Sequence, residues 1–582
     1  MTRHNTFRTT ISRVLGYVVI VIGTGTAVPT SAQNGQGFPD DWTHHHVVFS
    51  NPGTFEEALK NGAYDRWASI VTDPRYRIQQ MKRAATAAPA VGESDGASGG
   101  DAAHGKPLVT DWTVTLSATL NSGVALEMYP AKYTFAPVGS PDCVNDYVVF
   151  PITAAGNSSN QANLVGVNSL YLGTCTLAPV PTVLFAYFVG TGKIQTSPVL
   201  SLDGTKVAFV ESVSSGSIFH VLKLDKSGNS GCPSAKPCNG TSFNAPKAPG
   251  GALNNAVDTK ITMSGGVSVT RSSPFVDYKN DIACVGDDTG KLHKFTGVFL
   301  GTPAEAGSPW PVTVNNGIIL TSPVFDGGAS KNIFVGGSLG KLWCTTSTGA
   351  PCPTASINVG TGSHPAILDA PIVDSTRQTV FAAAQTNSNV VLGQATTALA
   401  SPVIAAMGTS TAGTQNIYNG AFDSAYFANV STGHMYFCGN DSSAHNTLLR
   451  VSFNASGTMA GAPDLGSFAL TTGATVDCTP LTEILNTAQG KDYLFVGIRD
   501  FGFTTGTTNC GGHTCTASFV LPTASPFTFP TAANATTTSN LGSNGLGGMI
   551  IDNASGLAGA SQIYFGNLQN QTGVQVSQSA LK

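Results

Sequence analysis

The sequence predicts an all-β protein, and three observations lead to that class. Only 11% of the 582 residues are charged, while glycine and proline together fill nearly a hundred positions, 66 and 32. Short apolar runs separated by Gly, Ser, Thr and Asn recur along most of the chain, a pattern typical of many short strands. Finally, one arrangement of strand signals repeats from about residue 141 to the C-terminus.

The charge balance excludes one large class of function. Lysine and arginine number 29 and aspartate and glutamate 33, which gives a formal net charge of −4. A protein that binds nucleic acid through phosphate contacts needs a basic surface. We therefore expect no nucleic-acid partner.

Residues 1–32 are predicted to be a secretory signal peptide. A basic leader with Arg3, Arg8 and Arg13 precedes the apolar run 14–28, which small residues follow. The run is too short and too rich in glycine for a membrane anchor. We expect a secreted or periplasmic protein without a membrane span once this peptide is removed.

Residues 33–87 are predicted to be a short helical N-terminal segment. Thr54 and Glu57 have the spacing of a capping box, in which each side chain satisfies a backbone amide of the other residue. A further helix is expected from Pro74 to about Ala87. Residues 88–106 have the composition of a flexible linker, and the β domain would occupy residues 107–582.

Three consecutive histidines, His44, His45 and His46, suggest a metal site in this segment. They stand directly before an apolar run, and neighbouring side chains on a strand point to opposite faces. Three in a row on a strand cannot all face one ion. We therefore favour surface or packing histidines over metal ligands.

The repeat predicts the architecture. Each copy has a small residue, often proline, then an apolar strand, an acid, a turn, a second apolar strand, another turn and a third strand. The clearest copies begin at Ser273, Ser322 and Ala370, and looser ones begin at Pro141, Ser197, Gly420, Thr479 and Gly548. The clear copies lie about 49 residues apart, which fits a four-stranded sheet repeated around an axis. We predict a β-propeller of eight four-stranded blades, with seven as the alternative.

The two ends of the chain are predicted to close the ring. The last repeat supplies three strands before the sequence stops, so its blade needs a fourth from elsewhere. The segment KYTFAPV, residues 132–138, stands just ahead of the first repeat and is the strand predicted to complete that blade.

Two stretches carry a family resemblance. VGGSLGKL, residues 335–342, resembles the PQQ-like repeat of quinoprotein-type propellers, and SPVLSLDGTKVAFV, residues 197–210, is similar to the WD40-like repeat of exported proteins. The resemblance covers roughly residues 130–575. For quinoprotein dehydrogenases it implies pyrroloquinoline quinone, calcium, a catalytic aspartate and a disulfide between adjacent cysteines. The sequence has no adjacent cysteines and only 5 tryptophans, so we predict no cofactor.

One acidic position recurs in successive repeats and forms the most regular candidate site. It is occupied by Asp277, Asp326, Asp374, Asp423 and Asp552. In a ring these acids would form a layer that could bind a cation or act on a substrate. Because a catalytic residue is needed once, repetition favours an architectural role in which each acid accepts backbone N–H groups of the following turn.

Eleven cysteines in an exported chain predict disulfides. Three close pairs are candidates for small bridges: Cys232 with Cys238, Cys344 with Cys352, and Cys510 with Cys515. Two longer bridges are possible, Cys143 with Cys175 and Cys438 with Cys478. Cys284, inside an apolar run, is the candidate for the thiol that an odd number leaves over.

The sequence contains no recognisable catalytic or metal-binding motif. The leading hypothesis is therefore a secreted or periplasmic module that binds a protein or glycan, with insertions after Lys226, Asn440 and Arg499 as variable surface. Two alternatives stay open: an extracytoplasmic lyase or hydrolase with a site at the central channel, and a degenerate quinoprotein-like dehydrogenase. A cluster of acid, histidine or arginine side chains that a single blade presents at the channel and the other blades lack would favour an enzyme.

Overall fold

A computed structural model describes most of the chain from residue 37 onward. The described residues are 37–84, 108–124, 127–135, 141–175, 180–233, 238–266, 269–328, 330–409, 416–471, 477–486, 490–498, 504–505, 508–509, 514–530, 535–537, 545–552 and 562–578. The predicted signal peptide and linker lie outside them. None of the helices in these ranges has the length and apolar character that a bilayer crossing requires.

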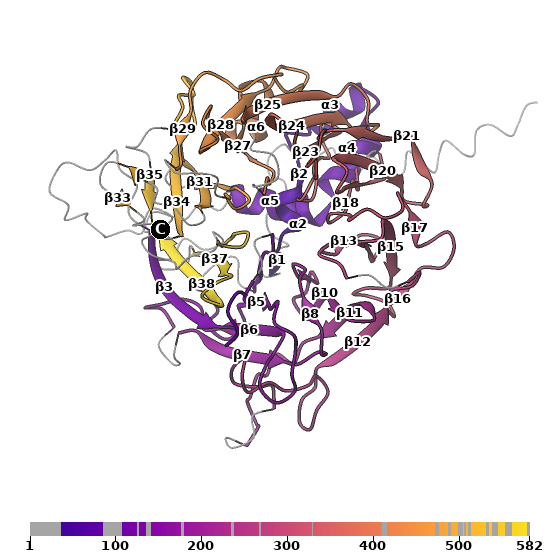
Figure 1. Cartoon of the computed structure of the whole chain (residues 1–582), viewed down its shortest axis with the longest axis vertical. Helices are drawn as coiled ribbons and strands as arrows, with labels where there is room; N and C mark the ends of the chain where they lie inside the picture. The colour runs from indigo at the N-terminus through magenta and orange to yellow at the C-terminus, as the bar shows by residue number, and fades with distance from the viewer. Residues whose placement is uncertain are drawn as a thin grey trace, which may run out of the picture. The chain divides into compact units, whose positions relative to one another are not determined.

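Within Gly37–Lys582 the strands form eight sheets arranged as blades around a central axis (Figure 1). The first strand of each blade lies nearest the axis and later strands lie further out. In β23 (Thr379–Gln385) every residue is buried, so both faces of this sheet need an apolar neighbour. A ring supplies that neighbour to every blade. The prediction of an all-β propeller with eight blades, not seven, is confirmed.

The first four blades follow the chain from residue 131 to residue 358. Blade 1 contains β4 (Ala131–Thr134), β5 (Tyr147–Pro151), β6 (Leu164–Asn168) and β7 (Thr182–Tyr187). Blade 2 contains β8 (Lys193–Ile194), β9 (Val199–Leu200), β10 (Lys206–Val213), β11 (Gly216–Lys223) and β12 (Val257–Thr262). Blade 3 contains β13 (Phe275–Asp277), β14 (Ile282–Gly286), β15 (Lys291–Thr296), β16 (Ala304–Glu305) and β17 (Val312–Thr313). Blade 4 contains β18 (Val324–Phe325), β19 (Asn332–Gly336), β20 (Lys341–Thr346) and β21 (Pro351–Asn358).

The other four blades complete the ring. Blade 5 contains β22 (Ile372–Asp374), β23, β24 (Asn389–Thr396) and β25 (Val403–Thr409). Blade 6 contains β26 (Ala421–Phe422), β27 (His434–Asn440), β28 (Asn446–Ser452) and β29 (Phe468–Ala469), with α6 (Ser424–Ala428) and a 3-10 turn (Val430–Thr432) after its first strand. Blade 7 contains β30 (Thr482–Asn486), β31 (Lys491–Ile498), β34 (Cys515–Leu521) and β35 (Ala535–Thr537), with a small hairpin of β32 (Thr504–Thr505) and β33 (Thr508–Asn509). Blade 8 contains β36 (Ile550–Asp552), β37 (Gln562–Asn567), β38 (Thr572–Gln578) and β3 (Leu108–Thr115).

The strand that closes the ring is β3, which corrects the sequence prediction. β3 pairs antiparallel with β38 from Leu108 opposite Gln578 to Thr115 opposite Thr572. The segment predicted for this place, residues 132–138, instead contributes to β4, the inner strand of blade 1. The reason is that β4 is itself an inner strand, with Pro130 before it as prolines precede other inner strands. Its repeat is hard to recognise because Tyr133 stands where most repeats have an acid.

The Ser-Pro pair of the repeat has a structural role between blades. The backbone N–H of Tyr129 donates to Ser197 Oγ, that of Ser197 to Ser273 Oγ, and that of Ser273 to Ser322 Oγ, at 3.0, 2.8 and 2.8 Å. Each bond joins the entry of one inner strand to the next blade. These buried hydrogen bonds satisfy backbone groups that the narrow inner strands leave unpaired.

The N-terminal segment contains four helices: α2 (Thr43–His46), α3 (Phe55–Lys60), α4 (Tyr64–Val71) and α5 (Pro74–Ala84). The capping box predicted at Thr54 is present, since its side chain accepts from the Glu57 N–H and Glu57 caps the Thr54 N–H. The helix predicted from Pro74 is present as α5. It follows α4, a separate helix that the sequence analysis did not predict. The histidines expected on a strand lie in α2 instead.

Residues 37–84, called the axial segment below, pack against the inner strands of the ring. β1 (Phe38–Asp40) pairs with β4 of blade 1, and β2 (Val47–Val48) pairs in parallel with β22 of blade 5. Trp42, only 2% exposed, donates to the Pro274 carbonyl of blade 3. Figure 1 shows α2 and α5 at the centre of the ring. The axial segment therefore occupies the channel and contacts several blades at once.

Disulfides join four of the predicted pairs: Cys143–Cys175, Cys232–Cys238, Cys344–Cys352 and Cys438–Cys478. The last of these links β27 of blade 6 to the loop that leads into blade 7. Cys284 is a buried free thiol, as the odd count predicts. Cys510 lies outside the described residues, so its predicted bridge to Cys515 is not described.

Candidate functional site

The recurring acids lie where the inner strands end, on the side of the ring that the axial segment covers. Four of them accept a backbone N–H from two or three residues further along the chain: Asp277 from Lys279, Asp326 from Gly328, Asp374 from Thr376 and Asp423 from Tyr426. Asp374 also accepts the Ser50 N–H of the axial segment. These hydrogen bonds order the turns after the inner strands, and Asp374 also binds the axial segment.

Asp552 differs from the other recurring acids. Its carboxylate accepts from the buried Lys132 ammonium and from the Tyr171 hydroxyl, both in blade 1. The recurring acids are therefore not brought together as one cluster: each serves its own blade or the contact with a neighbouring one.

The three histidines lie inside the channel, beside a small cavity of about 100 Å³ between the axial segment and blades 5 to 7. Burial lowers the pKa of His44 and His45 well below the ordinary value, and lowers that of His46 less because the Asp369 carboxylate is 3.6 Å away. Among the described residues no set of three His, Cys, Asp or Glu side chains is placed to hold a metal. His46 is buried, His44 and His45 are partly exposed, and the lowered pKa values favour the neutral form of all three.

The other end of the channel opens into a hollow of about 1190 Å³. It is lined by the loops that lead into the inner strands, such as residues 319–322 and 366–370, and by turns within blades 1, 3 and 4. Helices α4 and α5 contact residues that follow the inner strands, such as Gly327 and Tyr278, so the hollow and these two helices lie at opposite ends of the channel. We call this hollow, with its lining, the channel mouth.

One position of the repeat gives the channel mouth its chemistry. Three residues before the proline that precedes each inner strand, blades 1 to 5 carry Glu127, Gln195, Arg271, Leu320 and Leu368, all of which line the hollow. The acids after the inner strands recur from blade to blade, whereas the position three residues before the proline changes from blade to blade. Variation on a repeated scaffold is expected of a surface shaped for a ligand.

The polar wall of the channel mouth combines acids with a single arginine. Arg271 Nη1 lies 3.5 Å from Glu127 Oε1, with the two side chains 65% and 25% exposed. Burial raises the pKa of Glu127 above its usual range, opposed by Arg271. Burial likewise raises the pKa of Asp288 to about 6, with Arg271 opposing and the Asp287 carboxylate adding to the shift. Carboxyls with raised pKa values beside an arginine are typical of functional sites.

Asp369 and Tyr418 form the floor of the channel mouth. Asp369 accepts the backbone N–H groups of Ala370 and Asn419 at 2.8 and 2.9 Å, and it also borders the small cavity beside the histidines. Burial raises the pKa of both floor residues. The floor therefore separates the open hollow from the axial segment.

A second set of side chains in the lining is apolar and unusually exposed, and we call this set the apolar wall. Leu120, Val269, Ile319 and Leu368 line the hollow with exposed fractions of 73, 48, 53 and 42%. Most large apolar side chains in folded proteins are buried, and an exposed group at one concave surface marks an interaction site. The channel mouth thus offers exposed apolar side chains together with acids and an arginine.

Sequence analysis did not identify the channel mouth. Asp288 lies in the turn between β14 and β15, where an acidic residue by itself gives no signal of a binding site. The signal that could have found the site was the variable position before the proline, visible on aligning the repeats. In the described part of the chain, the insertions after Lys226 and Asn440 do not contribute to the lining, and most of the insertion after Arg499 lies outside the described residues.

Comparison with known proteins adds no family. No protein-family model and no curated protein matches the chain. Among solved structures it is similar to BamB from Moraxella catarrhalis, at 11% identity over 81% of this chain and 99% of that chain, with a TM-score of 0.38. The WD40 domain of coronin from Toxoplasma gondii has 11% identity, coverage of 75% and 86%, and a TM-score of 0.37. Dihydro-heme d1 dehydrogenase NirN has 11% identity, coverage of 85% and 88%, and a TM-score of 0.38.

These similarities are too distant to transfer an activity. The class of the protein, an eight-bladed β-propeller with an occupied channel, follows from its own strand pairing. The quinone implied by the PQQ-like resemblance does not fit the residues present. Tyr418 is the only aromatic side chain in the lining of the channel mouth, so a planar quinone finds no tryptophan to stack on.

Proposed function

We propose that this protein is an extracytoplasmic binding module whose channel mouth holds an extended segment of another protein. The observation that carries the proposal is the position that varies between blades, with Glu127, Gln195 and Arg271 in blades 1 to 3 and Leu320 and Leu368 in blades 4 and 5. An extended peptide presents alternate side chains to opposite sides. A hollow that offers both polar side chains and exposed apolar ones can contact both sides of such a ligand.

The same lining favours a peptide over a glycan. Sugar rings are held by stacking on aromatic faces, and the channel mouth offers Tyr418 alone, itself only 6% exposed. Four exposed aliphatic side chains suit the apolar residues of a peptide instead. The mixed charges, with Lys193 and Arg271 near Glu127 and Asp288, suit a ligand without strong net charge.

An extracytoplasmic location is part of the proposal. The basic leader and apolar run of residues 1–32 support export. Disulfides such as Cys438–Cys478, which joins two blades, form and persist in oxidising compartments. A rigid ring with one free concave end would serve there as a scaffold.

Selection from a random 12-residue peptide library displayed on phage, with the purified protein immobilised, tests the proposal. We expect peptides with apolar residues at alternate positions, bound with micromolar Kd. The double variant Ile319→Asp, Leu368→Asp should weaken binding at least tenfold, because it places charges in the apolar wall.

Leu300→Asp provides a matched control for this experiment. Leu300 is 84% exposed in a loop of blade 3 and does not line the channel mouth. This control should bind selected peptides like the wild type. The proposal fails if the wild type selects no peptide, or if the control and the wall variant lose binding equally. Binding on a glycan array without peptide binding would also overturn it.

A hydrolase or lyase is the second candidate, because Asp288 and Glu127 lie beside Arg271 with raised pKa values. With a pKa of about 6, Asp288 can exchange protons near neutral pH. Turnover of a panel of polysaccharide and peptide substrates, lost in Asp288→Asn, would favour this function. Peptide binding without turnover would favour the binding module.

A further inference from the structure

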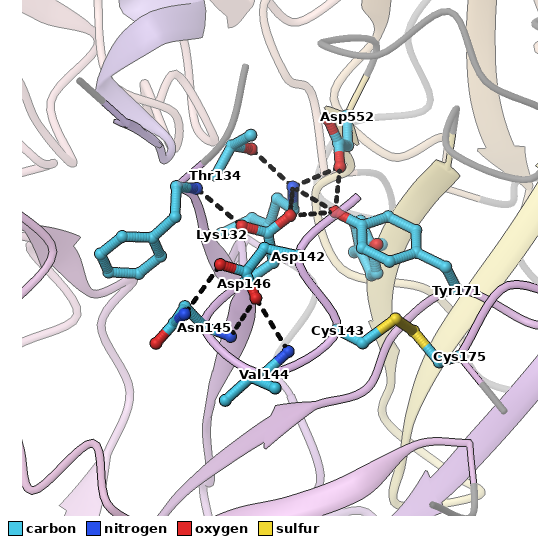
Figure 2. A network of polar contacts seen from close by, with 12 residues as sticks. Lys132, Thr134, Asp142, Cys143, Val144, Asn145, Asp146, Tyr171, Cys175 and Asp552 are labelled. Carbon is cyan, nitrogen blue, oxygen red and sulfur yellow. Dashed lines mark hydrogen bonds and ion pairs between the residues drawn. A yellow bond between two sulfur atoms is a disulfide. The ribbon is translucent and has the colours of Figure 1, made fainter. Parts of the chain in front are cut away.

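Lys132 is a fully buried lysine in the wall of the channel. It lies on β4 with its side chain 1% exposed, and its Nζ contacts the carboxylate of Asp552 on β36. Its ammonium also donates to Thr134 Oγ1 at 2.5 Å and to the Tyr171 hydroxyl at 3.1 Å, and Asp146 Oδ2 lies 4.0 Å away (Figure 2). One amine and two carboxyls thus meet without access to water.

The Tyr171 hydroxyl lies between the two carboxyls. Its oxygen lies 2.6 Å from Asp146 Oδ2 and 3.2 Å from Asp552 Oδ2, so its single proton can be donated to either carboxyl group. The disulfide Cys143–Cys175 ties the segment that carries Asp146 to the turn that carries Tyr171 (Figure 2). The geometry of the group is therefore fixed by covalent and hydrogen-bonded supports.

Burying this ion pair is costly, because both groups lose their hydration. Burial also raises the pKa of Asp146, so this carboxyl holds its proton more readily than usual. A chemical step that removed charge from the group would relieve the cost.

We propose that Lys132 and Asp552 form an intramolecular isopeptide bond that joins blade 1 to blade 8. A proton first passes from the Lys132 ammonium to the Asp552 carboxylate, which leaves a neutral amine and a neutral acid. The amine nitrogen then bonds to the Asp552 side-chain carbonyl carbon, the C–OH bond breaks, and one water leaves. No oxidant or other reactant is needed.

Asp146 is the group that moves protons in this step. Its carboxyl donates a proton to the departing hydroxyl and takes one from the attacking nitrogen, so it ends unchanged. Tyr171 positions Asp146 against Asp552. A desolvated lysine is a competent nucleophile once neutral.

The bond would strengthen the ring where it is otherwise closed by hydrogen bonds. Lys132 and Asp552 are 420 residues apart in sequence and belong to the first and last blades. In the described residues, β3 and β38 form the strand pairing that closes this junction. A covalent link at the adjacent inner strands would prevent the two blades from separating.

Cleavage at methionine tests the proposal on the full-length, folded protein after reduction and denaturation. Met128 and Met263 release fragment 129–263, which holds Lys132, and Met549 releases fragment 550–582, which holds Asp552. We expect the two fragments to remain joined, with a mass lower than their sum by one water, about 18 Da.

The variant Lys132→Arg should give separate fragments, each at the mass of its own sequence, which excludes a link at any other residue. Asp146→Asn keeps the amine and its partner but removes the proton carrier, so it should leave most molecules unlinked, and Asp146→Glu should restore linkage in part. If the wild-type fragments separate at their summed mass, the isopeptide bond does not exist. Linkage that persists in Lys132→Arg would also overturn the assignment.

Discussion

Replacing Asp288 with asparagine should stabilise the protein at neutral pH. Asp288 lies in the turn between β14 and β15, and its Oδ1 is buried without a hydrogen-bond partner among the described residues. A carboxylate in that position is poorly solvated. Asparagine keeps the size of the side chain and removes the charge.

The magnitude follows from the shift of the Asp288 pKa from 3.8 to about 6. Such a shift corresponds to about 3 kcal/mol for a group sealed from water, and to about 1–2 kcal/mol after allowing for the partial exposure of this side chain. Because the pKa is raised in the folded state, ionisation of Asp288 destabilises the fold. The full stability is present below the unfolded pKa of 3.8 and is lost as the pH rises through about 6. The gain in Asp288→Asn should therefore grow between about pH 4 and pH 7.

Urea unfolding followed by tryptophan fluorescence measures this gain. At pH 7.5 the variant should be more stable than the wild type by about 1–2 kcal/mol, and at pH 4 the two should be equal within error. Equal stability at pH 7.5 would refute the burial of the carboxylate. A gain of the same size at both pH values would assign the effect to packing rather than to charge.

Three further outcomes are expected. Trp42→Ala should cost about 3–5 kcal/mol of local stability through lost burial and the lost hydrogen bond to the Pro274 carbonyl. Limited trypsin digestion should then cut within the axial segment while the blades resist. Resistance of the axial segment equal to that in the wild type would count against this prediction. Because burial lowers the pKa of His44 and His45, the stability of the axial segment is complete above the unfolded pKa of about 6.5 and declines as the pH falls below it. Hydrogen exchange measured at pH 7.5 and at pH 5 should show this decline. The double variant His44→Gln, His45→Gln should lessen the decline. Burial raises the pKa of Cys284 to about 12, so a maleimide at pH 7.5 should label this thiol only after denaturation. Peptide mapping identifies the labelled cysteine. Labelling of Cys284 in the native protein would show that the thiol is accessible.

Much of the ring could be predicted from the sequence because each blade is local. The inner, second and third strands of blades 3 and 4 follow one another within about 25 residues, so their apolar runs and turns identify them in the repeats from Ser273 and Ser322. Closure could not be assigned so reliably. β3 and β38 lie at opposite ends of the sequence, and nothing in a strand's own residues identifies so distant a partner.

Local sequence patterns could not predict the pairing of the axial segment or the channel mouth, for different reasons. β1 and β2 span 3 and 2 residues, and they exist only because the inner edges of blades 1 and 5 offer open hydrogen-bonding groups. The channel mouth assembles single side chains, such as Glu127 and Arg271, from blades that are far apart in sequence. Each alone looks like an ordinary loop residue.

Hydrogen exchange with and without a selected peptide tests most directly whether the channel mouth is the binding face. Protection should appear in residues 118–122, 269–271, 319–322 and 366–370, the loops that line the hollow. Exchange in the axial segment should stay unchanged. Protection confined to helices α3 to α5, or to the insertion after Lys226, would place binding elsewhere and contradict the account.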